Sequence, residues 1–290
     1  MPAGTLYVVA PPIGNLEDVT LRALAVLREV SLIACEDTRQ TRKLLNRHSL
    51  RTPTVSFHRF NEERAVPGLL RKLGAGMDLA LVTDGGTPSV SDPGFSLVRA
   101  CRESGIPVVP VPGPSALLAA LVGSGLPADR FSFFGFLPHR SGERRRFLGS
   151  LRERRETLVF FDSPRRVAGS LGEMAQILGD RPAAVCREMT KVHEEFRTGT
   201  LAGLAAQLRG VALRGEVTLV VGGAPPPASR SAGPETLRAE VEREVRDRGV
   251  SRRDAARAVA LRRGIPRKEV YRSLKGSGGE GGPDGAREEE

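Results

Sequence analysis

The sequence has few of the residues and patterns that mark several common classes of protein. It contains only three cysteines, Cys35, Cys101 and Cys186, which lie far apart and form no C-x-x-C pair. No zinc site, other metal site or thiol redox motif is therefore indicated, and we expect three buried, reduced thiols. No window approaches the roughly 18 unbroken apolar residues that span a bilayer. The first residues, MPAGTLYVVAPPIGN, lack the basic segment of a signal peptide, so the sequence predicts a soluble, cytoplasmic protein without a membrane partner.

Two common phosphate-binding patterns are also missing. No G-K-[ST] occurs, which argues against a P-loop nucleotide hydrolase. The segment PPIGNLED (11–18) follows the first apolar run, where α/β proteins often hold ligands, but it is not G-x-G-x-x-G. A dinucleotide site is only weakly indicated, and taken alone this segment is equally well interpreted as an ordinary tight turn.

Short apolar runs alternate with segments of helical periodicity along most of the 290 residues. Strands are predicted at 6–10, 31–35, 52–57, 78–82 and 107–112, and then at 131–137, 157–161, 182–188 and 217–223. Nearly continuous apolar strands separated by helices are typical of a parallel sheet covered on both faces. We therefore predict two α/β domains, residues 1–113 and 114–223, with a mainly parallel sheet in the first.

The composition of the chain changes after residue 223. Residues 224–234, APPPASRSAGP, are predicted to form a linker. Residues 235–275 predict three helices, broken at Gly249 and Gly264, that are similar to a small helix-turn-helix module. The Gly-rich, acidic residues 276–290 are predicted to be disordered.

Positive charge is concentrated in two segments of this chain, whose net charge is +10. Residues 235–275 carry 13 Lys or Arg against 7 Asp or Glu, and residues 139–156 carry 7 Arg against 3 Glu. Such patches favour a polyanionic partner, with nucleic acid ahead of a membrane. The alternatives are an arginine-rich composition without function and a C-terminal arm that only packs. The candidate side chains for binding such a nucleic acid, which the resemblance described below implies to be RNA, are Arg39, Arg144, Arg145, Arg252, Arg253, Arg267 and Lys268.

Polar segments follow several of the predicted strands. They are CEDTR (35–39), SFHRFNEE (56–63), VTDGGTPSVSDPG (82–94), VPGPSA (111–116) and EMTKVHEEF (188–196). In the third of them Gly85 and Gly86 allow a close approach of the backbone to a ligand, beside hydroxyl and carboxylate groups. This floor suits a cationic, hydroxylated ligand better than a triphosphate. Asp92 and Ser115 are also expected to cap the helices that follow them.

The set of motifs LYVVAPPIGNLEDVTLRAL, CEDTR, SFHRFNE, LVTDGGTPSVSDPG, VPVPGPSALLAAL, GFLP, FFDSPRR and EMTKVHEE, in this order and spacing, resembles the tetrapyrrole-methylase superfamily. The resemblance covers roughly residues 5–223. Within the superfamily, the chain looks like the members that methylate small-subunit ribosomal RNA. It departs from the family pattern at Pro11, where Thr is expected, at Gly85, which replaces Ala, and at DSPRR, which replaces E-S-P-H-R.

The resemblance implies a cleft between two α/β domains that holds S-adenosylmethionine, usually in a homodimer. It implies 2′-O-methylation of a cytidine in the decoding centre of 16S ribosomal RNA, within the small ribosomal subunit. The cofactor-binding positions that it implies are Gly86, Thr87, Val90, Ser115 and Ala116. Asp84 and Gly85 are expected to complete the same floor.

A ribose 2′-hydroxyl is a poor nucleophile, so a general base is expected to help. The candidates are Asp37, Glu62, Glu188 and Lys191, the last only if its pKa is depressed. Our hypothesis is that Asp37 and Lys191 face each other across the cleft; positioning without a base is the alternative. Two other functions stay open, namely methylation of a tetrapyrrole or corrinoid precursor and a non-enzymatic RNA-binding role on the same fold.

Overall fold

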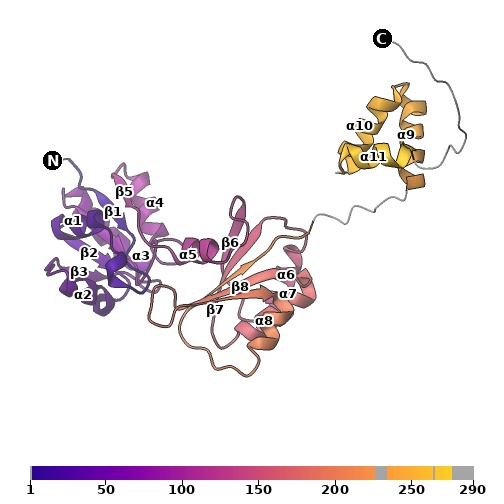
Figure 1. The fold of residues 1–290 in the computed structure, drawn as a ribbon. Coiled ribbons are helices and arrows are strands. Elements are labelled where there is room, and N and C mark those ends of the chain that lie inside the picture. Colours follow the sequence, from indigo (N-terminus) through magenta and orange to yellow (C-terminus); the bar gives the residue numbers. More distant parts are fainter. Residues whose placement is uncertain (1, 226–233, 264, 276–290) are drawn as a thin grey trace, which may run out of the picture. The chain divides into compact units, whose positions relative to one another are not determined.

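The computed structural model describes residues 2–225, 234–263 and 265–275. The chain divides into two compact units, Met1–Ala224 and Pro225–Glu290 (Figure 1). Most of the predicted linker (226–233), the predicted helix break at Gly264 and the predicted disordered tail (276–290) lie outside the described residues. Within the described ranges, no helix combines the length and the hydropathy that crossing a membrane requires.

The first sheet has five parallel strands in the order β3-β2-β4-β1-β5. The strands are β1 (Leu6–Val9), β2 (Leu32–Cys35), β3 (Thr54–Ser56), β4 (Leu79–Val82) and β5 (Val108–Val111), and the helices between them are α1 (Leu21–Glu29), α2 (Thr38–Arg47), α3 (Glu62–Gly74) and α4 (Phe95–Glu103). Apolar side chains of α1 and α2 pack on one face of this sheet, and those of α3 and α4 pack on the other. The predicted parallel sheet, covered on both faces, is confirmed.

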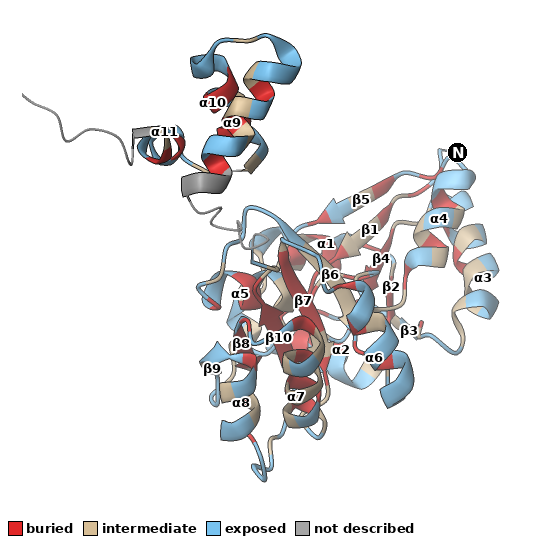
Figure 2. Cartoon of the chain, turned by 90° about the vertical axis from the view of Figure 1, so that its right-hand side faces the viewer, coloured by how far each residue is buried: buried red, intermediate tan, exposed pale blue. Residues whose placement is uncertain are grey.

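The second sheet is mixed, with the order β6-β7-β10-β8-β9. Only β6 and β7 run parallel, and the other three pairs are antiparallel. Its elements are α5 (Ala116–Gly123), β6 (Phe131–Phe136), α6 (Ser141–Ser150), β7 (Thr157–Asp162), α7 (Val167–Leu178), β8 (Pro182–Arg187), β9 (Glu195–Thr200), α8 (Leu201–Gln207) and β10 (Val217–Val221). Helices α6, α7 and α8 cover one face and α5 covers the other. Figure 2 shows buried residues, in red, along the strands of both sheets.

Two elements of the second α/β domain are absent from the sequence-based prediction. Helix α6 lies inside the basic segment 139–156 and presents a narrow apolar stripe that includes Leu148. Strand β9 pairs only with β8, at the edge of its sheet, and its residues are mainly polar or half-exposed. Neither segment has the strong apolar periodicity on which sequence-based assignment depends.

Of the two helix caps predicted at Ser115 and Asp92, one is confirmed. The hydroxyl of Ser115 accepts a hydrogen bond from the Leu118 amide at 3.4 Å and caps α5, as predicted. The prediction that Asp92 caps α4 is wrong, because the N-cap residue is Gly94, with φ of 135°. A side chain at that position would lie 2.7 Å from Ser89 Oγ and 2.8 Å from Leu81 Cδ2.

The described residues of the second unit form the helices α9 (Pro234–Arg248), α10 (Arg252–Arg263) and α11 (Arg267–Lys275). Gly249 follows α9 with φ of 62°, a conformation that favours glycine. The unit has its own small core, formed by Leu237, Val241, Ala255, Ala256, Val259, Ala260 and Val270.

Candidate functional site

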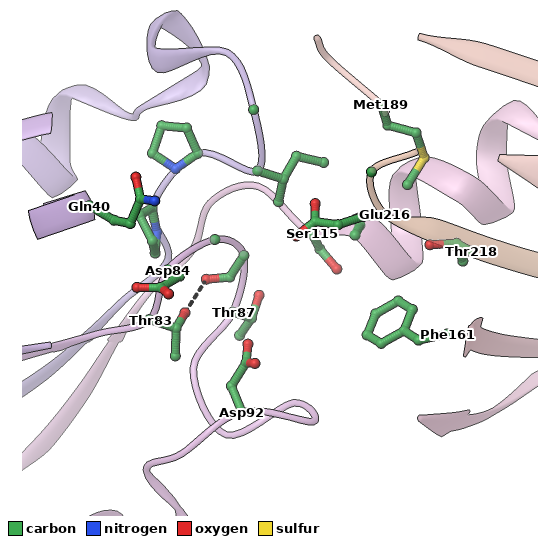
Figure 3. Close-up of a pocket in the computed structure, with 18 of the residues that line it drawn as sticks. Gln40, Thr83, Asp84, Thr87, Asp92, Ser115, Phe161, Met189, Glu216 and Thr218 are labelled. Carbon is green, nitrogen blue, oxygen red and sulfur yellow. Dashed lines mark hydrogen bonds between the residues drawn. The ribbon is translucent and has the colours of Figure 1, made fainter. Parts of the chain in front are cut away.

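A cavity of about 840 Å³ lies between the two sheets of the first unit (Figure 3). The first α/β domain lines it with the segments that follow β1, β2 and β4 and with part of α2. The second contributes the start of α5, the ends of β6 and β7, the segment that follows β8 and the start of β10. This volume falls in the range of about 300–1,000 Å³ that is usual for small-molecule sites. A crevice at the carboxyl ends of parallel strands is also where open α/β sheets bind ligands.

All seven residues that were predicted to bind the cofactor line this one cavity. They are Asp84, Gly85, Gly86, Thr87, Val90, Ser115 and Ala116. The Gly86 amide donates to the Pro11 carbonyl at 3.1 Å, and the Thr83 hydroxyl donates to the Gly86 carbonyl at 3.2 Å. These bonds hold Gly86 at φ of 87° and fix the loop as a rigid floor. The structure brings the seven together, and their role toward a cofactor stays a prediction.

The same loop contains two non-glycine residues in the left-handed region. Ser89 and Ser91 have φ of 70° and 67°. Such conformations cost free energy and persist where the surrounding structure determines them. Here the Ser89 amide donates to the Pro93 carbonyl at 3.3 Å, and the packing around Gly94 closes the turn. Both residues belong to the segment 82–94, which forms one wall of the cavity.

Carboxylates dominate the electrostatics of the cavity. Figure 3 shows Asp84 and Asp92 on the side of the first domain. Burial, together with the charges of Glu36, Asp84 and Glu216, raises the pKa of Asp92 to about 7. Burial also raises the pKa values of Glu36 and Asp84 above their ordinary range. A cavity in which carboxylates are crowded in this way favours a cationic ligand.

Lys191 and Glu188, two of the predicted base candidates, line the cavity as an ion pair. Lys191 Nζ donates to Glu188 Oε1 at 2.9 Å and to Glu216 Oε2 at 3.2 Å. Burial alone would lower the pKa of Lys191, but the two carboxylates outweigh it and the pKa lies above its usual value. The depressed pKa that a lysine base requires is therefore not found. For Glu188, burial is likewise outweighed, here by the Lys191 hydrogen bond, and its pKa is lowered.

The loop of the second α/β domain that carries Lys191 also packs against the first α/β domain. Glu188 and Thr190 have positive φ values of 49° and 66°. The Asn15 amide donates to Thr190 Oγ1 at 3.0 Å. A side-chain carbon at Gly14 would lie 2.5 Å from Lys191 Cγ, so glycine is required for this approach. The contact fixes the position of Lys191 against the segment that follows β1.

The predicted pair of Asp37 and Lys191 across the cleft is not formed. Asp37 is not among the residues that line the cavity. It caps α2, and its carboxylate binds the Arg39 side chain, with a shortest distance of 2.7 Å. The Arg39 hydrogen bonds lower the pKa of Asp37 to about 2, which makes it a weak base. Its backbone amide donates to Asp84 Oδ1 at 3.0 Å and thereby orients a residue of the cavity.

Glu62, the fourth base candidate, has a structural position outside the cavity. Its Oε1 accepts hydrogen bonds from the amides of Gly94 and Ser96, both at 3.1 Å, and from the Ser96 hydroxyl at 2.5 Å. A carboxylate at the start of a helix satisfies free amides and interacts favourably with the helix dipole. Glu62 therefore takes the capping role that the sequence assigned to Asp92.

Asp162, at the end of β7, is a residue of the cavity that the predicted set omitted. Its side chain is fully buried, and Oδ1 accepts from Arg166 Nη2 at 2.6 Å. Within the described part of the chain, Asp162 Oδ2 and Arg166 Nε are buried without a partner. The DSPRR motif after a strand was the available signal. Further lining residues outside that set include Glu36, Phe161, Met189, Glu216 and Thr218.

One of the predicted RNA-binding arginines is a structural residue. Arg144 is buried and binds Glu173 at 2.7 Å, and it also donates to the carbonyls of Pro138 and His139. It is therefore not available to a polyanion, because its donors are already used inside the protein. Of the others, Arg39, Arg145, Arg252, Arg253, Arg267 and Lys268 are exposed.

Replacing Arg144 with alanine is expected to lower the free energy of unfolding by about 3 kcal/mol, because Glu173 loses its buried partner. RNA affinity should stay unchanged at temperatures where the variant is folded. Urea unfolding and a filter-binding assay measure the two quantities. The neighbouring Arg145→Ala variant, exposed at the same helix, should be nearly neutral for stability. An Arg144 variant that is fully stable but binds RNA weakly would contradict this assignment.

Comparisons with known proteins agree with the fold and the motifs. Residues 5–205 match the family model described as Tetrapyrrole (Corrin/Porphyrin) Methylases. The ribosomal RNA small subunit methyltransferase I of Mesorhizobium japonicum is 46% identical over 95% of this chain and 94% of its own length. The protein of the same name from Thermotoga maritima is 45% identical over 76% of this chain and 99% of its own length.

Solved structures of the same fold also match. A uroporphyrin-III C-methyltransferase from Thermus thermophilus, complexed with S-adenyl homocysteine, superposes with a TM-score of 0.53. It is 24% identical and covers 76% of this chain and 97% of that chain. From the family model and the curated relatives together, the chain belongs to the tetrapyrrole methylase family and, within it, to the family of ribosomal RNA small subunit methyltransferase I.

Proposed function

We propose that this protein transfers a methyl group from S-adenosylmethionine to the 2′-oxygen of a cytidine in the decoding centre of 16S ribosomal RNA. Methyl transfer as the class of reaction and S-adenosylmethionine as the donor follow from membership of the family. The activity for which the relatives are named supports small-subunit ribosomal RNA as the acceptor. The nucleotide and the oxygen come from the sequence resemblance and are the parts to be tested.

The observation that carries the proposal is the carboxylate-lined cavity between the two α/β domains. S-adenosylmethionine bears a sulfonium cation and an ammonium group. Glu36, Asp84, Asp92 and Glu216 surround this space with negative charge. The only Lys or Arg residues among those that line it are Lys43 and Lys191, and Lys191 is already paired with two carboxylates. These groups fit a cationic donor and do not fit a triphosphate.

When bound, S-adenosylmethionine supplies a methyl group to the ribose 2′-oxygen, and S-adenosylhomocysteine remains. The rigid floor at Gly86 and the capped start of α5 at Ser115 supply fixed surfaces that position the reactants, which is the main contribution of an enzyme to such a transfer. A proton must leave the 2′-hydroxyl. We propose that the Asp92 carboxylate accepts it, because Asp92 lines the cavity and its pKa of about 7 suits a base near neutral pH.

The affinity for S-adenosylmethionine is expected to rise between about pH 6 and pH 8, as Asp92 ionises and adds a negative charge to the cavity. The empty protein should show the opposite trend in stability. A raised pKa favours the protonated carboxyl in the folded state, so that contribution is lost as the pH rises through about 7. Calorimetric titration across this range measures the affinity. In the Asp92→Asn variant, the rise in affinity with pH should be largely lost. An unchanged pH profile of affinity in this variant would contradict the assignment of the titration to Asp92.

A methylation assay tests the proposed function directly. Labelled S-adenosylmethionine is incubated with the protein and either small ribosomal subunits or naked 16S ribosomal RNA that lacks the modification. The expected result is label on one cytidine 2′-oxygen, located by nucleotide mapping, with the two substrates compared for rate. Labelling of a corrinoid precursor instead, or tight RNA binding without any transfer, would overturn the proposal. A homodimer, which the resemblance implies, is proposed as well and is tested by light scattering.

A further inference from the structure

Charge is distributed unevenly among the three helices of the second unit. Residues 237–248, in α9, contain four Lys or Arg and four Asp or Glu, so this segment is neutral. Residues 251–274, which include α10 and most of α11, contain eight Lys or Arg and two Asp or Glu, a net charge of +6. The positive charge of the unit therefore resides in α10 and α11.

The acidic residues of α9 neutralise one set of the arginines of α10. Arg252 binds Glu242 at 3.5 Å, Arg262 binds Glu244 at 2.9 Å, and Arg263 binds Glu240. The side chain of Glu244 is 9% exposed, so its ion pair with Arg262 lies partly inside the helical bundle. These arginines connect α10 to α9 and are engaged within the unit.

A second set of side chains forms a different surface, which we call the basic face. It consists of Arg253, Arg257 and Leu261, four residues apart along α10, and of Arg267 and Tyr271, four residues apart on α11. A hollow of about 300 Å³ is lined by Arg257, Leu261 and Arg267, together with Ala260 and Ile265. The Tyr271 hydroxyl donates to the Arg253 carbonyl at 3.4 Å, which places the tyrosine beside the start of α10.

The basic face combines free charge with exposed apolar surface. Its three arginines are exposed and have no ion-pair partner among the side chains that the structure describes. Leu261 is 86% exposed and Tyr271 is 36% exposed, so apolar and aromatic surface lies beside these arginines. A helix that serves only as a packing arm needs neither feature. Guanidinium groups alternating with an aromatic ring and a shallow apolar hollow are the elements with which proteins hold a single nucleic-acid strand.

We propose that the basic face binds a single-stranded segment of RNA, with phosphates at Arg253, Arg257 and Arg267 and a base against Tyr271. The proposal deepens the proposed function, on which it rests, because it assigns one surface of the second unit to the RNA substrate. The proposal also changes the set of RNA-binding residues that was predicted from the sequence. Arg252 leaves this set because it is paired with Glu242, and Arg257 and Tyr271 are added to it. Because its residues do not line the cavity, the face is expected to add affinity for RNA and not chemistry.

The test uses the full chain with two triple variants that remove equal charge. The first, R253A/R257A/R267A, removes the arginines of the basic face. The matched control, R238A/R243A/R246A, removes three arginines of α9, of which Arg238 pairs with Glu242. Affinity for a labelled single-stranded RNA of about 20 nucleotides is measured against salt concentration. Each phosphate contact to a single strand contributes about −0.7 to the slope of log affinity against log salt.

The first variant is expected to bind the RNA at least about tenfold more weakly, with a salt slope reduced by about 2. The control should keep the slope within about 0.5 of wild type. Equal effects of the two variants would show a response to total charge and overturn the proposal, as would no effect of either. Tyr271→Leu, which keeps an apolar side chain, should weaken binding about threefold to tenfold without changing the slope; a change in slope would contradict its stacking role.

The methylation assay separates this inference from the proposed function. On small subunits, R253A/R257A/R267A should raise the KM for the RNA substrate and leave kcat and S-adenosylmethionine affinity unchanged, since its residues do not line the cavity. A wild-type protein that never transfers methyl groups, yet binds RNA through this face, would refute the proposed function alone. A variant with wild-type KM and salt slope, in a protein that methylates the subunit, would refute the basic face alone.

Discussion

Replacing Gly86 with valine is expected to weaken S-adenosylmethionine binding by at least about 100-fold while the protein stays folded. Gly86 has φ of 87°, which a β-branched residue adopts only with strain. Its side chain would start 3.4 Å from Ile13 Cγ2, inside the ring of residues that line the cavity. The floor must therefore shift away from its hydrogen bonds to Pro11 and Thr83. Calorimetric titration with S-adenosylmethionine measures the loss.

Gly105 offers a matched control for this substitution. It also has a positive φ, 68°, but a side chain there meets nothing within 4 Å and it does not line the cavity. Gly105→Val should lose a similar amount of stability, about 1–3 kcal/mol, because the backbone strain is alike. Its affinity for S-adenosylmethionine should equal that of the wild type. If both variants bound the cofactor normally, the loop 82–94 would not be the cofactor floor.

Asp162→Ala is expected to cause the largest loss of stability, about 3–5 kcal/mol in the free energy of unfolding. The substitution removes a fully buried carboxylate and leaves the Arg166 guanidinium, 22% exposed, without its partner at 2.6 Å. A largely buried charge that loses its carboxylate partner is costly. Because Asp162 also lines the cavity, methyl transfer should fall with it. Urea unfolding and the labelled assay measure the two effects.

The control for Asp162 is an ion pair of the same spacing at the surface. Glu103 pairs with Arg99 at 2.7 Å, also four residues apart, but both side chains are more than 60% exposed. Glu103→Ala should cost less than about 0.5 kcal/mol, because exposed pairs are screened by water and salt. The two substitutions test whether burial decides the energy of the pair. A difference of less than about 1 kcal/mol between them would contradict this account of Asp162.

The family, the two α/β domains and the parallel first sheet could be predicted from the sequence, because each depends on local patterns. Apolar runs such as 78–82 are long enough to identify a buried strand without knowledge of its neighbours. Strand β9 could not be identified in this way, since an edge strand is half-exposed and its pairing with β8 is set by contacts distant in sequence. Helix α6 was not predicted, because it contains several arginines and too few apolar residues to give a clear helical periodicity.

The candidate site also contains parts that could be predicted from the sequence and parts that could not. The floor at 82–94 was predictable because its glycines, hydroxyls and carboxylates lie in one continuous motif. The roles of single charged residues were not, since the sequence does not show which of several local or distant partners each side chain contacts. Lys191 is held by Glu216, 25 residues away, and Arg144 by Glu173, 29 residues away. Asp37 was assigned to the cleft because of its position after a strand, but Arg39 two residues later engages its carboxylate instead.

The carboxylates of the cavity also influence which groups of an RNA substrate can enter it. The chain as a whole carries a net charge of +10 and attracts a polyanion, whereas its cavity is lined by Glu36, Asp84, Asp92 and Glu216. The negative charge of this interior is expected to repel phosphate groups. Only the uncharged part of a nucleotide, its sugar and base, enters without electrostatic penalty. The sign of the field therefore supports the proposed sugar oxygen, rather than a phosphate oxygen, as the methyl acceptor.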